Sequence, residues 1–298
     1  MLTGFTFSKI IIIESLRQNE YNSAADLHGY IQSQLEDTQL GIDATLIHCE
    51  SAGDFMSLVE HLTHAAMKND EWPLLHIECH GDDETGIEFT DRSELSWAEV
   101  ADALVKLNRA TRFNLMTVFA TCFGFHFSGE ISAIKPSPCW CVIGPTDSVM
   151  PDEIARNFRT FYRDLFQNRE MSKAVDRLHS EGLELGQWLV QPAEVRYLQI
   201  ATGYIKEHCT LTETTRKAKR LRKRLKLDGL YPPSLPEIEA TIRRKSTDDL
   251  IVKYFDRFFM VAEIPEGADR FRTAREKLKS TINELKATGK FGLASHQS

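Results

Sequence analysis

The fold can be inferred from the stretch Pro73-Leu-Leu-His-Ile-Glu-Cys-His80-Gly81, an apolar run that ends in a histidine and a glycine. Such a run is typical of a buried strand followed by a loop. A second run, Leu115-Met-Thr-Val-Phe-Ala-Thr-Cys122-Phe-Gly124, ends in the same way on a cysteine. Because ligands bind at the carboxyl ends of strands in open α/β sheets, we expect His80 and Cys122 to face one crevice.

Strand-like and helix-like segments alternate on both sides of these two runs. Apolar residues at spacings of three and four, preceded by capping residues, predict helices that begin near Ser23, Ser51, Ser96 and Asp152. Strands are predicted over Lys9–Glu14, Ile42–Cys49, Pro73–Cys79, Leu115–Ala120 and Trp140–Gly144. The alternation predicts an α/β fold with a doubly wound, mainly parallel sheet flanked by helices.

Side-chain alternation separates the polar residues of the first run. Cys79 should point to the opposite face of the strand from His80 and is interpreted as a core residue. His76 shares the face of His80 and is interpreted as a packed side chain. After His80 we predict an acidic loop, Gly81–Gly86, and a small hairpin arm at Ile87.

The strand pattern fades after about residue 186, and helical, charged sequence follows. We therefore predict a catalytic-type domain over 1–185 and a helical, basic C-terminal domain over 186–298 that serves regulation or partner binding. Tyr231-Pro-Pro-Ser-Leu-Pro236 should break two helices apart. The aromatic residues of Tyr254–Met260 are interpreted as the core of the second domain, with a partner interface as the alternative.

Composition indicates a cytoplasmic protein. No apolar run approaches the roughly 20 residues that span a bilayer, so no membrane partner is expected. The N-terminus lacks the pattern of a secretory signal, and six cysteines in a chain of 298 residues do not suggest a disulfide framework. The cysteines should therefore be free thiols.

The net charge of −7 conceals two opposite halves. Residues 1–150 hold 8 Lys and Arg against 22 Asp and Glu, whereas residues 151–298 hold 28 against 21. Eight basic residues fall within Arg216–Lys226, with apolar residues at helical spacing. This basic helix could cover a phosphate backbone, an acidic protein or the acidic first half of the chain, and we favour an internal acidic partner over nucleic acid.

A cysteine followed by glycine, together with a strand-end histidine, provides the groups of a thiol hydrolase. The imidazole of His80 can take the proton of Cys122 during attack on a carbonyl. Backbone N–H groups of Gly81 and Cys122 can hold the oxyanion that this attack creates. No cofactor is needed for such chemistry.

With these motifs the chain resembles the caspase-like (clan CD) cysteine peptidases, and among them the bacterial CHAT domain family. The resemblance rests on His80-Gly81, on Ala120-Thr-Cys122-Phe-Gly124 placed 42 residues later, and on Val142–Asp147 followed by Phe158-Arg-Thr-Phe-Tyr162. It implies a Cys122 nucleophile, a His80 base and a Gly81 oxyanion donor. It also implies a protein substrate, a regulated effector role in bacterial defence or stress, and an activating partner or ligand that docks on the C-terminal region.

The S1 pocket expected from the resemblance lies between the loops that follow the fourth and fifth strands. Caspases place a glutamine and arginines in these loops to bind aspartate, whereas this chain has Ala120 and Gly144–Asp147. Cleavage after aspartate is therefore not expected. Asp147, with Thr121 as a second substrate-binding residue, would instead favour Lys or Arg at P1.

Two alternatives stay open at this stage. The fold could be an inert binding module in which Cys122 and His80 have no chemistry. The residues Cys122, His126, Cys139 and Cys141 could hold zinc, but the Cys-x-Cys spacing across a strand start disfavours that ligand set, so no metal is predicted.

Overall fold

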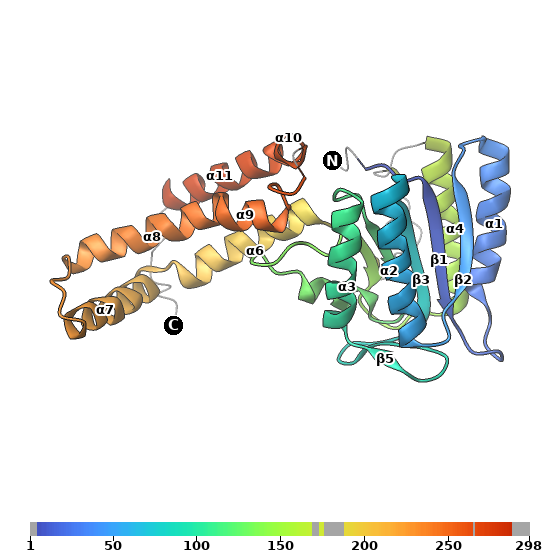
Figure 1. The fold of residues 1–298 in the computed structure, drawn as a ribbon, viewed down its shortest axis with the longest axis horizontal. Coiled ribbons are helices and arrows are strands. Elements are labelled where there is room, and N and C mark those ends of the chain that lie inside the picture. Colours follow the sequence, from blue (N-terminus) through green and yellow to red (C-terminus); the bar gives the residue numbers. More distant parts are fainter. Residues whose placement is uncertain (1–4, 169–172, 176–187, 265, 288–298) are drawn as a thin grey trace. The chain divides into compact units, whose positions relative to one another are not determined.

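The computed structural model describes residues 5–168, 173–175, 188–264 and 266–287. The chain forms two compact units, the first made of Met1–Ile131 with Ser137–Ala193 and the second of Ser132–Pro136 with Glu194–Ser298 (Figure 1). The predicted boundary at 185/186 lies outside the described residues. None of the helices in the described ranges combines the length and the apolar character that a membrane span requires.

A six-stranded path of a mostly parallel sheet forms the centre of the first unit. Its strand order is β2-β1-β3-β6-β7-β8, with parallel pairs from β2 to β7 and an antiparallel final pair. The strands are β1 (Lys9–Ser15), β2 (Asp43–His48), β3 (Pro73–Asp82), β6 (Met116–Phe119), β7 (Cys141–Pro145) and β8 (Trp188–Pro192). The five predicted strands are confirmed, and β8 was not predicted.

Helices flank this sheet (Figure 1). α1 (Ser23–Thr38) packs against α4 (Pro151–Asn168), and α2 (Ala52–Asn69) packs against α3 (Trp97–Ala110). α2 and α3 each begin with a capping box, formed by Ser51 with Asp54 and by Ser96 with Glu99. The predicted α/β class with helices around a mainly parallel sheet is therefore confirmed.

The end of β3 differs from the prediction. The strand continues to Asp82 and pairs antiparallel with β4 (Gly86–Glu88), which in turn pairs with β5 (Glu94–Leu95). The hairpin arm predicted at Ile87 is thus present, but Gly81 lies within the strand, opposite Ile87, and not in a loop. The prediction was wrong here because β4 supplies hydrogen-bond partners that the sequence pattern did not reveal.

A buried polar network connects β3 to the helices of one face. His76 is fully buried, and its Nε2 lies 3.1 Å from Glu78 Oε1. Tyr162 of α4 shares a 3.2 Å hydrogen bond with His76 Nδ1, and the hydroxyl of Ser23 in α1 donates to the Glu78 carboxylate. The interpretation of His76 as a packed residue is confirmed, and its polar atoms are satisfied.

The second unit is helical. It contains α6 (Ala193–His208), α7 (Leu211–Leu227), α8 (Leu235–Ile251), α9 (Lys253–Phe258), α10 (Gly267–Arg270) and α11 (Arg272–Ala287). Phe255, Phe258 and Phe259 are buried and surround Tyr197, whose hydroxyl donates to the Leu250 carbonyl at 2.6 Å. The aromatic cluster is therefore core, as predicted, and the proline-rich break indeed separates α7 from α8.

Removal of the Tyr162 hydroxyl tests the polar network. In Tyr162→Phe, His76 Nδ1 stays buried without a partner, so the free energy of unfolding should fall by roughly 1–3 kcal/mol. Urea denaturation followed by tryptophan fluorescence measures this, because Trp72, Trp97, Trp140 and Trp188 all lie in the first unit. Tyr30→Phe is the control, since the structure gives the Tyr30 hydroxyl no hydrogen bond; equal losses in the two variants would contradict the network.

Candidate functional site

The candidate site lies where the winding of the sheet changes direction. From β1 the chain crosses to β2 on one side, whereas β3, β6 and β7 follow on the other. In sheets of this kind the crevice for ligands opens at the carboxyl ends of the two strands at the switch, here β1 and β3. His80 lies near the end of β3, and Glu20 lies in the segment that follows β1.

His80 and Glu20 are paired across this switch point. His80 Nε2 lies 3.0 Å from Glu20 Oε1 and 3.1 Å from Oε2, and their side chains are 42% and 28% exposed. Burial opposes ionisation of Glu20, but hydrogen bonds from the Arg17 amide and from His80, together with their charges, lower its pKa overall. Glu20 is therefore a carboxylate that fixes one ring nitrogen of a solvent-accessible imidazole.

Cys122 follows β6 and lies against the same strand end. A Cβ at Gly81 would come within 2.3 Å of Thr121 Oγ1 and 2.4 Å of the Cys122 carbonyl oxygen. Contact this close is open only to glycine, so Gly81 allows the Cys122 turn to pack directly beside His80. The sequence predicts Cys122, His80 and Gly81 as one site; the structure places Gly81, the residue after His80, against the backbone of Cys122.

The side chains of His80 and Cys122 have different partners in the structure. His76, Glu78 and His80 alternate along β3, and the first two contact α1 and α4. Cys122 Sγ points to the carbonyl of Val149, 3.8 Å away and two residues before α4. Among the contacts of the described residues, no hydrogen bond joins this sulfur to the imidazole.

The Cys122 amide is free to donate. Among the described residues it donates no hydrogen bond, whereas the next two amides are used: Phe123 N–H donates to the Asp147 carbonyl at 3.2 Å and Gly124 N–H to the Thr121 carbonyl at 3.1 Å. Phe123 has a left-handed backbone, with φ of 58°, which turns the chain at this point. An unused N–H at a turn beside a thiol is the arrangement expected of an oxyanion donor.

The two residues expected to bind substrate differ in their position. Asp147 is exposed, and the hydrogen bond from Phe123 to its carbonyl holds it beside the Cys122 turn; its carboxylate accepts from the Ser148 amide at 2.7 Å. Thr121 is only 1% exposed and packs against Gly81. The exposed side chain of Asp147 is therefore accessible to a ligand, whereas the buried side chain of Thr121 packs under the Cys122 turn against Gly81.

The other thiols are unsuited to chemistry. Of the six free cysteines, Cys122 alone is partly exposed. Burial raises the pKa of Cys79 to about 12 and that of Cys49 to about 11. Cys79 is core, as predicted. Within the described residues there is no group of three or more His, Cys, Asp or Glu side chains that could hold a metal ion.

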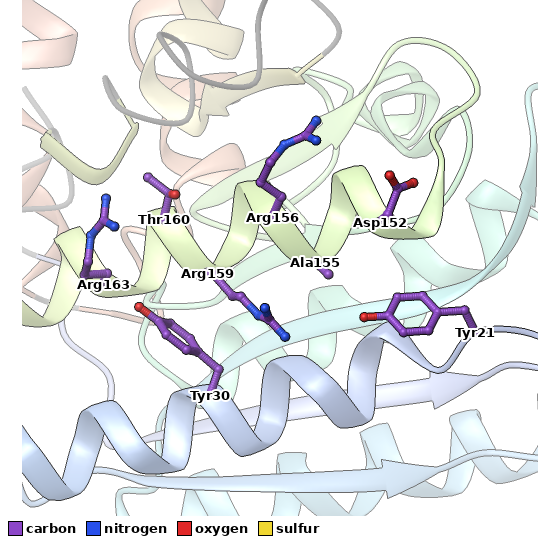
Figure 2. Close-up of a pocket in the computed structure, with 8 residues that line it drawn as sticks. All are labelled: Tyr21, Tyr30, Asp152, Ala155, Arg156, Arg159, Thr160 and Arg163. Carbon is purple, nitrogen blue, oxygen red and sulfur yellow. The ribbon is translucent and has the colours of Figure 1, made fainter.

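A cleft of about 480 Å³ lies between α1 and α4, beginning at Tyr21, the residue after Glu20. Figure 2 shows that Arg159 points toward Tyr30 and Tyr21, whereas Arg156 and Arg163 extend from α4 in another direction. Arg159 already pairs with Asp26 at 3.6 Å. Its other lining residues include Asp152, Thr160, Arg156 and Arg163, and no cysteine or histidine lines it.

Glu20 is a residue of the candidate site that the sequence analysis did not identify. It stands in a polar segment, Arg17-Gln-Asn-Glu20, that has the composition of an ordinary loop. Its signal was its position: it follows a predicted strand, at the sheet edge where His80 was already placed. Recognising it requires knowing that β1 is the neighbour of β3.

No protein-family model matches the chain, and a search of curated proteins found no relative.

An added methyl group at Gly81 tests the close contact on which the site depends. Gly81→Ala should lower the free energy of unfolding by roughly 1–3 kcal/mol, because a backbone carbonyl must move to admit the side chain. The matched control is Gly29→Ala in α1, where nothing lies within 4 Å and alanine should stabilise the helix by about 0.5–1 kcal/mol. Tryptophan-monitored urea denaturation compares them, and a Gly81→Ala protein of undiminished stability would contradict the contact.

Proposed function

We propose that the protein is a cysteine endopeptidase in which Cys122 is the nucleophile, His80 the general base and Glu20 the group that positions His80. One observation carries the proposal. A partly exposed thiol with a free amide lies beside the strand end that presents an imidazole held by a carboxylate. Such a trio at a switch-point crevice supports nucleophilic chemistry.

The proposed reaction begins with a proton transfer. When Nε2–H of His80 donates to Glu20, the neutral ring has its lone pair on Nδ1, which takes the thiol proton of Cys122 directly or through one water. The sulfur attacks the peptide carbonyl, and the amides of Cys122 and Gly81 hold the resulting oxyanion. The imidazolium then protonates the leaving amine. Water, deprotonated by His80, hydrolyses the thioester and restores the thiol.

The lack of a described hydrogen bond between the thiol of Cys122 and the imidazole of His80 supports a regulated enzyme. Because Cys122 Sγ is directed at the Val149 carbonyl and not at the imidazole, a small movement of the turn must precede catalysis. Substrate or an activating partner would supply it. With the resemblance to the caspase-like and CHAT peptidases, this leads us to propose an effector protease of a bacterial defence or stress system, acting in the cytoplasm.

Covalent labelling tests the nucleophile and its base. A peptide with an electrophilic carbonyl group should modify Cys122, and Cys122→Ala should abolish the reaction. His80→Ala should slow labelling about 10²–10⁴-fold, because the thiol loses its proton acceptor. Glu20→Gln should slow it less, and should have no further effect in the His80→Ala background if Glu20 acts through His80. Mass spectrometry identifies the modified residue and gives the rate.

Cys79→Ala is the matched control, because this thiol adjoins His80 in sequence but is buried on the other face of β3. Its labelling should match that of the unaltered protein. If Cys122 reacts no faster than a free thiol and no peptide is cleaved with any activator, the fold is an inert binding module and the proposal fails.

We also propose that Asp147 selects a basic residue at P1. Fluorogenic peptides with Lys or Arg at P1 should be cleaved in preference to others, and Asp147→Asn should lower kcat/KM for them about tenfold, the low end of the roughly 1.5–3 kcal/mol of a charged hydrogen bond. Asp152→Asn, at the start of α4, removes an equal charge nearby and should leave the preference intact. A preference for Leu or Asp in the unaltered enzyme would exclude this role of Asp147.

A further inference from the structure

The hairpin of α7 and α8 carries a dense group of cations that its own acids do not neutralise. Arg216 pairs with Glu213, but in the described part of the chain the exposed Lys219, Arg220, Lys223, Arg224 and Lys226 have no ion pair. No acid lies between Glu213 and Asp228 in the sequence. The described acids of the second unit therefore do not pair with these cations, and the pairing with the acidic first half of the chain that the sequence favours stays a prediction.

The cations occupy the face of α7 that points away from α8. Thr214 and Ala218 are buried, Leu225 is half-buried, and Thr215 donates to Glu239 of α8 at 2.7 Å. Of the apolar residues of α7, Ala218 is buried and Leu225 half-buried against the hairpin, whereas Leu211, Leu221 and Leu227 are exposed. Leu227 is 78% exposed and Leu230 57% exposed near the end of the helix, so an anionic lipid surface is the alternative ligand that the experiment must exclude.

An aromatic ring stands at the end of this cationic face. Tyr231 is fully exposed, and it borders a hollow of about 290 Å³ lined with Arg222, Lys226, Leu230 and Pro232. Arg222 reaches this hollow with a buried Nε that has no hydrogen-bond partner. The exposed ring of Tyr231 can stack on an aromatic ligand, and the nearby Arg222 can donate hydrogen bonds to an anion.

We propose that this hairpin binds single-stranded nucleic acid, with the α7 cations on successive phosphates and a base stacked on Tyr231. A row of cations without intervening acids suits a phosphate backbone, and an aromatic face next to it suits an unpaired base. An acidic protein surface would pair with the cations but would have no base to stack on the ring of Tyr231. The binding is independent of the Cys122 chemistry and is a second activity of the chain.

The expected salt dependence follows from the number of contacts. Each phosphate contact on a single strand contributes about −0.7 to the slope of log K against log salt, so five contacts predict roughly −3.5. Lys219→Gln with Lys223→Gln should reduce the slope in magnitude by about 1.4. Tyr231→Ala should weaken binding roughly 5- to 150-fold, the loss typical of one stacked base, whereas Tyr231→Phe should retain it.

Fluorescence anisotropy of the full chain with a labelled oligonucleotide, single-stranded or annealed to its complement, measures these effects. Lys253→Gln with Lys277→Gln, which removes the same charge from α9 and α11, is the control and should preserve affinity and slope. Preference for the single strand over the duplex and over unlabelled polyglutamate supports the proposal.

Three results would overturn it: equal losses in the control and the α7 variant, an unchanged affinity in Tyr231→Ala, or stronger retention on anionic phospholipid vesicles than on the oligonucleotide at the same salt.

Discussion

The structure of the first unit depends on a column of ionisable side chains on one face of its central strand. His76, Glu78 and His80 alternate along β3 and point toward the helices of the same side. Burying ionisable groups between the sheet and its helices costs free energy unless each group has a hydrogen-bond or ion-pair partner. Ser23 and Tyr162 satisfy the two buried members, and these contacts also fix where α1 and α4 rest on the sheet.

His80, the last residue of this column, lies at the solvent-accessible end of the strand. His80 is 42% exposed, and the carboxylate that it contacts comes from the segment leading into α1. The same helix that satisfies Glu78 through Ser23 therefore delivers Glu20 to His80. Because Gly81 follows at once, the Cys122 turn can approach to van der Waals contact. The packing of the interior and the assembly of the candidate site thus follow from one strand and its two neighbours.

Patterns along the chain predicted much of this, and their failures have physical causes. The β-branched and apolar runs identified β1, β3, β6 and β7, since buried parallel strands have continuous apolar sequence. β8, Trp188-Leu-Val-Gln-Pro192, is an antiparallel edge strand, where a polar residue and a terminal proline are tolerated, so it lacks that pattern. Thr121 was expected in a pocket but is buried, because it packs against Gly81 of β3. Glu20 could not be found without the strand order.

The charged groups of the second unit differ from those of the first in whether they have partners. In the column on β3 each buried ionisable group has a partner in a neighbouring element. On α7, Thr214 and Ala218 are buried and Thr215 donates to Glu239 of α8, whereas the cations are left in solvent. Eleven basic residues against three acidic ones from Arg216 to Lys245 repel one another. That repulsion opposes folding of the hairpin, and a bound polyanion of the kind proposed above would relieve it.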